Sequence, residues 1–250
     1  MTEARKIKFE IAIVLLLSLG ASAIYSILSL IESATSKAGL AGSSSSLNSS
    51  ESNAELWDFI YRIVGLSLGF VPVALVLYLL WGTFGNPAKL IGLWKPQKSD
   101  WLRGAVLFAC IGIPGLALYL LARALGLAAR IIPGEFQYWW IIPVLLISAL
   151  KAALTEEVIM VGYLYKKFDE LKISFGWQQA ISSLIRASYH AYQGLAGFFG
   201  NLVMGLVFGW AYRRWGRVLP LVIAHFLLDA FSFVGYALLA KQLATLGGLF

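Results

Sequence analysis

The sequence has little charge and few reactive side chains. Asp, Glu, Lys and Arg make up only 13% of its 250 residues, whereas a soluble domain carries about 25%. There are two histidines and one cysteine, Cys110, and a single cysteine excludes a disulfide or a cysteine-based zinc site within the chain. The net charge of +7 is spread over short loops, so there is no soluble basic domain of the kind that binds nucleic acid.

Hydrophobic residues, in contrast, are abundant and gathered in long runs. They make up 59% of the chain, and the mean hydropathy is +0.76. An α-helix needs about 20 apolar residues to cross a bilayer, so the sequence predicts an all-α, multi-pass bundle surrounded by membrane lipids. The aromatic residues of "QYWWIIP" at 137–143 are typical of a membrane interface. We expect seven spans, at residues 9–31, 57–81, 101–125, 138–165, 174–193, 195–212 and 217–240.

The basic residues between these spans favour one orientation. With the N-terminus in the cytoplasm, alternation of the spans places 13 of them on the cytoplasmic side and 4 outside, which is the positive-inside bias. The predicted topology is therefore N-in and C-out. The cytoplasmic set is Arg5, Lys6, Lys8, Lys89, Lys95, Lys98, Arg103, Lys166, Lys167, Lys172, Arg213, Arg214 and Arg217, and the outer set is Lys37, Arg123, Arg130 and Lys241.

The N-terminal part, residues 1–84, contains two spans and a Ser-rich loop. Residues 4–23 have a basic start, an apolar middle and an Ala-x-Ala ending, as in a signal peptide. Because the apolar run continues to Ile31, an uncleaved anchor is favoured over a cleaved signal. The low-complexity residues 32–56 are expected to form a flexible outer loop. Residues 85–250 form the second part.

Ionisable residues interrupt three of the last four predicted spans, namely 138–165, 174–193 and 217–240. Such residues cost several kcal/mol at membrane depth and usually mark function. They are Lys151, Glu156, Glu157, Arg186, His190, His225 and Asp229, and they include both histidines of the chain. At 1.5 Å per residue, Glu156, His225 and Asp229 lie roughly 12–18 Å from the cytoplasmic ends of their spans, and His190 lies about 20–24 Å from its own. We therefore expect these groups to converge on one buried site.

These residue types suit the hydrolysis of an amide bond. A carboxylate can take a proton from water, and histidines can bind a metal or stabilise an oxyanion. His225 and Asp229 share one helix face. Glu156 and Glu157 point about 100° apart on a helix, so one can be chemical and the other structural, paired with Arg186 or Lys151. Neither G-x-S-x-G nor H-E-x-x-H is present.

Three segments together resemble a known family. "EEVIMVGYL" at 156–164, "RASYHAYQG" at 186–194 and "HFLLD" at 225–229 are similar, in order and spacing, to the CPBP family of CAAX-processing and bacteriocin-processing intramembrane endopeptidases, also called Abi proteins. The resemblance covers about residues 85–240 and implies a bacterial plasma-membrane protease whose substrate is a membrane-associated or lipidated polypeptide.

The resemblance also implies roles for individual residues. Glu156 would be the base that activates water, with Glu157 beside it. His190, His225 and Asp229 would polarise the scissile carbonyl or, together with Glu156, hold Zn²⁺ or another divalent metal. A mechanism without metal stays open at this stage.

Two departures from the family pattern keep other functions open. The motif Glu-Glu-x-x-x-Arg has Val161 at the arginine position, and the residue four before His190 is Arg186 instead of phenylalanine. We hypothesise that Arg186 supplies the missing cation and pairs with Glu157. The alternatives are a catalytically inactive scaffold or bacteriocin-immunity protein, and an ion-coupled transporter built on carboxylate–histidine relays.

Overall fold

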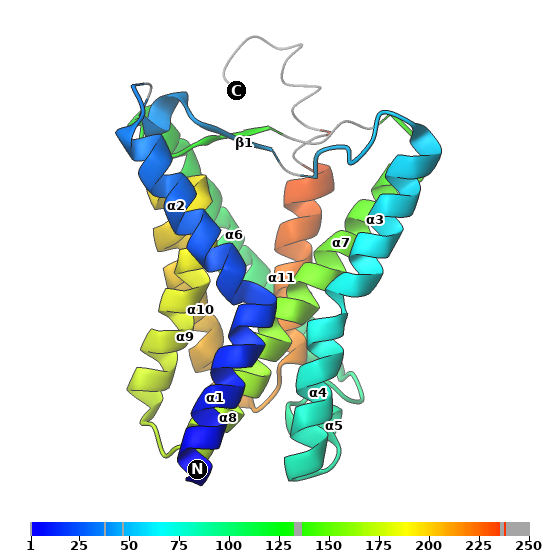
Figure 1. Ribbon diagram of the computed structural model, residues 1–250, viewed down its shortest axis with the longest axis vertical. Coiled ribbons are helices and arrows are strands. Elements are labelled where there is room, and N and C mark those ends of the chain that lie inside the picture. Colours follow the sequence, from blue (N-terminus) through cyan, green and yellow to red (C-terminus); the bar gives the residue numbers. More distant parts are fainter. Residues whose placement is uncertain (1, 38, 47, 133–136, 236–237, 239–250) are drawn as a thin grey trace.

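The computed structural model describes residues 2–37, 39–46, 48–132, 137–235 and 238. Within these residues the chain is a bundle of helices with two short strands (Figure 1). The end of the seventh predicted span and Lys241 lie outside the described residues. The elements are α1 (Glu3–Leu15), η1 (Leu16–Gly20), α2 (Ala21–Thr35), η2 (Leu40–Gly42), β1 (Ser44–Ser46), α3 (Glu55–Gly69), α4 (Val71–Phe84), α5 (Pro87–Leu90), α6 (Lys98–Ala124), β2 (Arg130–Ile132), α7 (Ile141–Glu156), η3 (Glu157–Tyr163), α8 (Leu164–Glu170), α9 (Phe175–Tyr189), η4 (Ala191–Gln193), α10 (Leu195–Trp215), α11 (Leu219–Ala230) and η5 (Phe231–Gly235).

Four helices in the described residues are long and apolar enough, by length and composition, to cross a membrane. They are Glu3–Thr35, Glu55–Phe84, Lys98–Ala124 and Leu195–Trp215, and Leu219–Gly235 is a shorter apolar helix. The consecutive helical segments α7, η3 and α8 contain buried charged residues. The 15 residues of α9 span about 22 Å, which is less than the hydrocarbon thickness of about 30 Å. The chain is thus a helical membrane protein, while seven spans with a cytoplasmic N-terminus stay a prediction.

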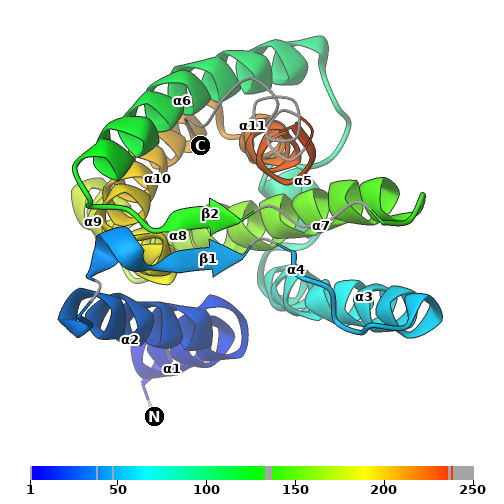
Figure 2. The ribbon, with the colours of Figure 1, turned by 90° about the horizontal axis from the view of Figure 1, so that it is seen from above.

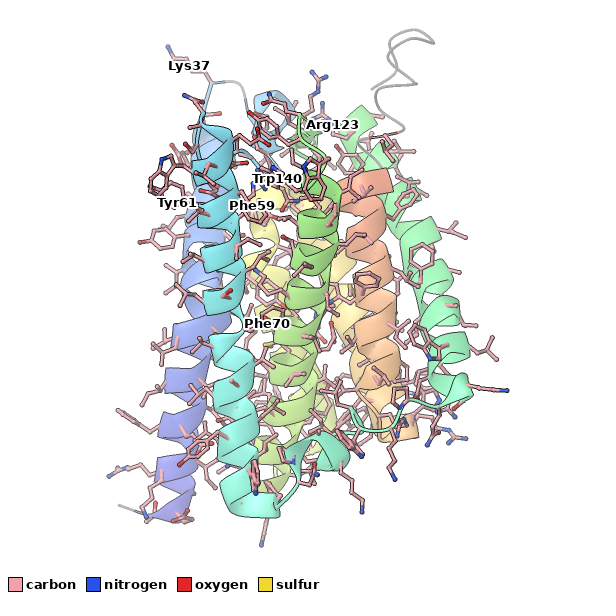
Figure 3. All side chains as sticks on the ribbon, turned by 90° about the vertical axis from the view of Figure 1, so that its right-hand side faces the viewer. Lys37, Phe59, Tyr61, Phe70, Arg123 and Trp140 are labelled. Atoms are coloured by element: carbon pink, nitrogen blue, oxygen red, sulfur yellow. The ribbon has the colours of Figure 1, made fainter. Side chains whose placement is uncertain are left out.

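The long helical segments run alternately up and down the bundle (Figure 1). The N-terminus, α5 and α8 lie at one end, and β1 and β2 lie at the other (Figure 1). Seen from above, α7 lies between α4 and α11 (Figure 2). At the end that holds the strands, Phe59 and Trp140 stack edge to face with ring centroids 5.2 Å apart (Figure 3). This pair, at the start of α3 and α7, fits the aromatic interface predicted from "QYWWIIP".

Close helix contacts place the elements that carry the buried polar residues. A Cβ at Gly104 of α6 would lie 2.5 Å from Ile223 Cγ2 of α11, and one at Gly205 of α10 would lie 2.8 Å from Ser183 Oγ of α9. Small residues permit this approach. At the base of α11, Arg217 pairs with Asp100 at 2.7 Å. These contacts hold α9 and α11 against their neighbours.

The Ser-rich loop differs from the expected flexible coil. Ser44–Ser46 form β1, which pairs in parallel with β2. Arg123 donates hydrogen bonds to the carbonyls of Ala41 (3.3 Å) and Ala128 (2.7 Å). The two strands lie between α2 on one side and α6 on the other (Figure 2). This pairing is long-range, so the composition of the loop alone did not reveal it.

The first helix packs into the same core as the second part of the chain. Ile7, Ile11 and Val14 belong to the core cluster that contains residues of η3 and α11. Glu10 Oε1 accepts a hydrogen bond from Tyr163 (2.9 Å) and pairs with the buried Lys167 (3.1 Å). The first helix is thus packed as part of the bundle, while the uncleaved anchor stays a prediction.

Glu10→Gln is therefore expected to lower stability by about 1–2 kcal/mol, because a buried cation loses a charged partner while Glu170 remains at 3.2 Å. Thermal unfolding in detergent measures the change. Glu3→Gln is the control: its pair with Lys6 is exposed and contributes almost nothing. Equal melting temperatures for the two variants would contradict a structural role for Glu10.

Candidate active site

Glu156 and Glu157 lie where an α-helix changes to a π-helical segment. Glu156 is the last residue of α7 and Glu157 the first of η3, and both are buried. π-helical turns are found frequently at functional sites. The Ser182 hydroxyl donates to the Met160 carbonyl at 2.9 Å, so α9 satisfies a backbone acceptor of the wider turns.

Arg186 of α9 faces both glutamates. Its Nη2 lies 2.8 Å from Glu157 Oε1, and its Nη1 lies 3.6 Å from Glu156 Oε2. The guanidinium also lies over the ring of Phe208, with Cζ 5.6 Å from the ring centroid. The hypothesised pairing of Arg186 with Glu157 is thus present. The alternative partner, Lys151, packs its stem against Gly69 instead.

His225 and Asp229 reach the same place from α11. His225 Nδ1 lies 2.7 Å from Glu157 Oε1, while its Nε2 lies 4.0 Å from Glu156 Oε2 and 3.4 Å from Asp229 Oδ2. Glu157 therefore holds both Arg186 and His225, whereas Glu156 faces the second ring nitrogen. The adjacent acids have different surroundings, as predicted, yet both belong to one cluster.

His190 comes to the cluster because α9 ends at Tyr189. Its Nε2 lies 3.6 Å from Glu156 Oε2. Both ring nitrogens are buried without a hydrogen-bond partner in the described part of the chain. The expected span 174–193 is not one continuous helix, since the 3₁₀ turn η4 follows His190. After this break the chain reverses direction and continues into α10. The reversal lies at about the membrane depth at which the sequence analysis places the polar residues.

Tyr189 is a site residue that sequence reasoning missed. Its hydroxyl donates to Glu156 Oε2 at 2.8 Å. It lies three residues after Arg186, and such residues are neighbours on a helix surface. That spacing within "RASYH" is a signal that could have identified it.

The site has an excess of negative charge. Three carboxylates, on Glu156, Glu157 and Asp229, surround one guanidinium and two imidazoles. Buried charge requires compensation, so the site favours additional positive charge. The side chains of Asp229 and His190 are 22% and 18% exposed, against 1% for Arg186. The cluster is therefore less enclosed at Asp229 and His190 than at Arg186.

The donor set fits a divalent metal. Ligand atoms of Glu156, Glu157 and His225 all lie within 4.8 Å of one another and are buried. His225 also keeps one ring nitrogen on a carboxylate and directs the other to Glu156 and Asp229, which is the usual outer support of a metal-binding histidine. The set expected from the sequence, Glu156, His190, His225 and Asp229, overlaps this group, and Glu157 is the addition.

Comparison with known proteins agrees with this arrangement. The family model "Type II CAAX prenyl endopeptidase Rce1-like" matches residues 138–231. No curated protein and no solved structure matches the chain. The matched segment runs from the start of α7 to the end of α11 and contains every residue of the cluster. The segment that builds the site is thus Rce1-like, in agreement with the resemblance to the CPBP family.

Proposed function

We propose that this protein is an intramembrane endopeptidase of the CAAX-protease type, which hydrolyses a peptide bond in a membrane-associated or lipid-anchored polypeptide. The family match implies a hydrolase of this kind. One observation carries the proposal: the Glu156 carboxylate, bound by Tyr189, faces the Nε2 atoms of both His190 and His225. A base beside two imidazoles is suited to activating water against an amide.

In this mechanism Glu156 Oε2 takes a proton from water, and the hydroxide formed attacks the scissile carbonyl carbon. His190 and His225 donate hydrogen bonds to the oxyanion that develops. Collapse of the tetrahedral intermediate breaks the C–N bond, and Glu156 returns its proton to the leaving amine. Arg186 and Glu157 do not touch the reacting atoms; they hold His225 and balance the charge around Glu156.

A divalent metal such as Zn²⁺ would be held by Glu156, His225 and Asp229 with His190, or by the overlapping group that includes Glu157. When bound, it would lower the pKa of water and polarise the carbonyl. Without a metal, Glu156 would serve as the base as described above.

The excess of carboxylates leads us to expect metal in the purified protein. Elemental analysis should find a divalent metal in stoichiometric amount in the wild type and little in His225→Ala. Chelation followed by dialysis should remove the cleavage activity, and Zn²⁺ should restore it. Active wild-type protein that is free of metal would contradict the metal site and leave a mechanism with the carboxylate alone.

Two other functions remain to be tested against the proteolytic one. Val161 in place of the family arginine favours an inactive scaffold or immunity protein that binds a peptide without cleaving it. Buried carboxylates beside histidines also serve proton relays in transporters. Both would be located, like the protease, in the cell membrane, and a bacterial plasma membrane is the proposed one.

Reconstitution in liposomes separates the three functions. The protein is mixed with peptides that carry a prenylated C-terminal Cys-aliphatic-aliphatic-X motif or an unmodified tail, and wild type is compared with Glu156→Ala. Cleavage that the variant loses supports the protease. Binding without cleavage supports the scaffold, and proton flux without cleavage supports the transporter.

A further inference from the structure

The ring of His190 is held by no short hydrogen bond: its nearest polar contact is Glu156 Oε2, 3.6 Å from Nε2. Both ring nitrogens lack a hydrogen-bond partner among the described residues. The ring instead lies against its aromatic neighbours: its centroid is 4.8 Å from that of Tyr189 and 6.5 Å from that of Tyr192, the latter nearly parallel at 24°. Most metal-binding or catalytic histidines have one nitrogen held by a carboxylate or a carbonyl. The turn that follows His190 carries the Tyr192 ring.

That turn, η4, is held on one side by the stretch before β2. Ala129 N–H donates to Gln193 O (3.3 Å), and Leu195 N–H donates to Leu127 O (3.1 Å). Gly194 has a positive φ of 88°, and a Cβ there would lie 2.9 Å from Ala128 Cα. Glycine permits both the backbone angle and the close approach.

On its other side, η4 is held by α2. The Tyr192 N–H donates to Ser26 Oγ of α2 at 2.7 Å. Ser26 is buried, unlike Ser22 on the same helix. Its hydroxyl therefore fixes the residue whose ring stacks on His190. The family match begins at residue 138, so this contact comes from a part of the chain that the match does not cover.

We propose that Ser26 is a positioning residue: by holding the Tyr192 amide, it fixes η4 and thereby the ring of His190 beside Glu156. Ser26 does not touch the reacting atoms. The helical segment Glu3–Thr35, which contains Ser26, is then part of the functional unit as well as part of the membrane anchor. The effect on catalysis rests on the proposed function, whereas the effect on His190 does not.

The structural test compares Ser26→Ala with Ser22→Ala in the full-length protein. Amide hydrogen exchange followed by mass spectrometry should show exchange in the η4 peptide that is roughly fivefold to tenfold faster in Ser26→Ala, because one hydrogen bond is lost. Modification of His190 by diethyl pyrocarbonate should also accelerate. Ser22→Ala should match the wild type in both measurements. Unchanged exchange and modification in Ser26→Ala would overturn the proposal, as would faster exchange spread evenly over α2, α9 and α10.

The kinetic test uses the peptide that the wild type cleaves. Ser26→Ala should lower kcat with little change in KM, and it should have no further effect in a His190→Ala background, because the two residues act through one group. Additive effects of the two substitutions would overturn the positioning role. If the wild type cleaves no peptide, the proposed function fails, and exchange and modification alone decide whether Ser26 holds His190.

Discussion

Arg186→Ala should cause the largest loss of stability of any single substitution at the site. Arg186 is 1% exposed and Glu157 is fully buried, and the guanidinium is the only permanently charged cation among the site residues described above. Its removal leaves buried carboxylates without a counter-charge, which costs about 3–5 kcal/mol. We expect a markedly lower melting temperature, poor yield of folded protein and no cleavage.

The control is Arg213→Ala, which removes another arginine–carboxylate pair. Arg213 and Asp169 lie 2.8 Å apart, but both are substantially exposed, so this substitution should cost at most about 1 kcal/mol. A silent Arg186→Ala, with melting and cleavage like those of Arg213→Ala, would contradict the assignment of Arg186 as the central counter-ion.

Whether Arg186 takes the place of the family's motif arginine, whose position is occupied by Val161 in this sequence, can be tested separately. From the sequence alone, Val161→Arg is expected to be tolerated. Because Val161 is buried in η3, we now expect the single variant to be destabilised by a buried cation in an apolar cluster. The double variant Arg186→Ala/Val161→Arg should regain stability relative to Arg186→Ala. Failure of this rescue would show that the two positions are not interchangeable.

Glu156→Gln should cause the largest loss of activity with the least damage to the fold. Glutamine keeps the shape and can still accept the hydrogen bond from Tyr189, but it cannot take a proton from water. General-base catalysis contributes about 10²- to 10⁴-fold, so the cleavage rate should fall by roughly that factor. The melting temperature should change little, since an excess negative charge is removed.

Glu157→Gln is the matched comparison, because it makes the same chemical change one residue away. Glu157 pairs with both Arg186 and His225 at 2.8 and 2.7 Å, so its loss should lower the melting temperature as well as the rate. Purified variants are compared by thermal unfolding and by initial cleavage rates. If Glu156→Gln unfolds and Glu157→Gln retains its fold without activity, the roles of the two acids are reversed.

Much of the site could be predicted because a membrane makes buried charge costly. In a chain with so few ionisable residues inside its apolar runs, Glu156, His225 and Asp229 stood out, and helix geometry placed them at similar depth. That a buried carboxylate needs a cation left Arg186 and Lys151 as possible partners. The specific pairing of Arg186 with Glu157 came from the resemblance to the CPBP family, whose motif arginine is replaced by Val161 in this sequence.

Other features depended on geometry that periodicity does not encode. A π-helical turn changes the angle between successive side chains, so the rule of about 100° per residue did not show that Glu156 and Glu157 share one cluster. The end of α9 at Tyr189 is accompanied by contacts of η4 with Ser26 and Ala129, which are distant in the sequence. The β1–β2 pairing has the same origin.

Cleavage in H₂¹⁸O tests the central claim most directly, namely that Glu156 activates a water molecule inside this cluster. Liposomes that contain wild type, Glu156→Gln or Glu10→Gln protein are incubated with a prenylated peptide, and the products are weighed by mass spectrometry. We predict that wild type and Glu10→Gln release a fragment whose new carboxylate carries one ¹⁸O, and that Glu156→Gln releases almost none. Peptide that binds to the wild type and remains intact, or equal cleavage by Glu156→Gln, would contradict the account.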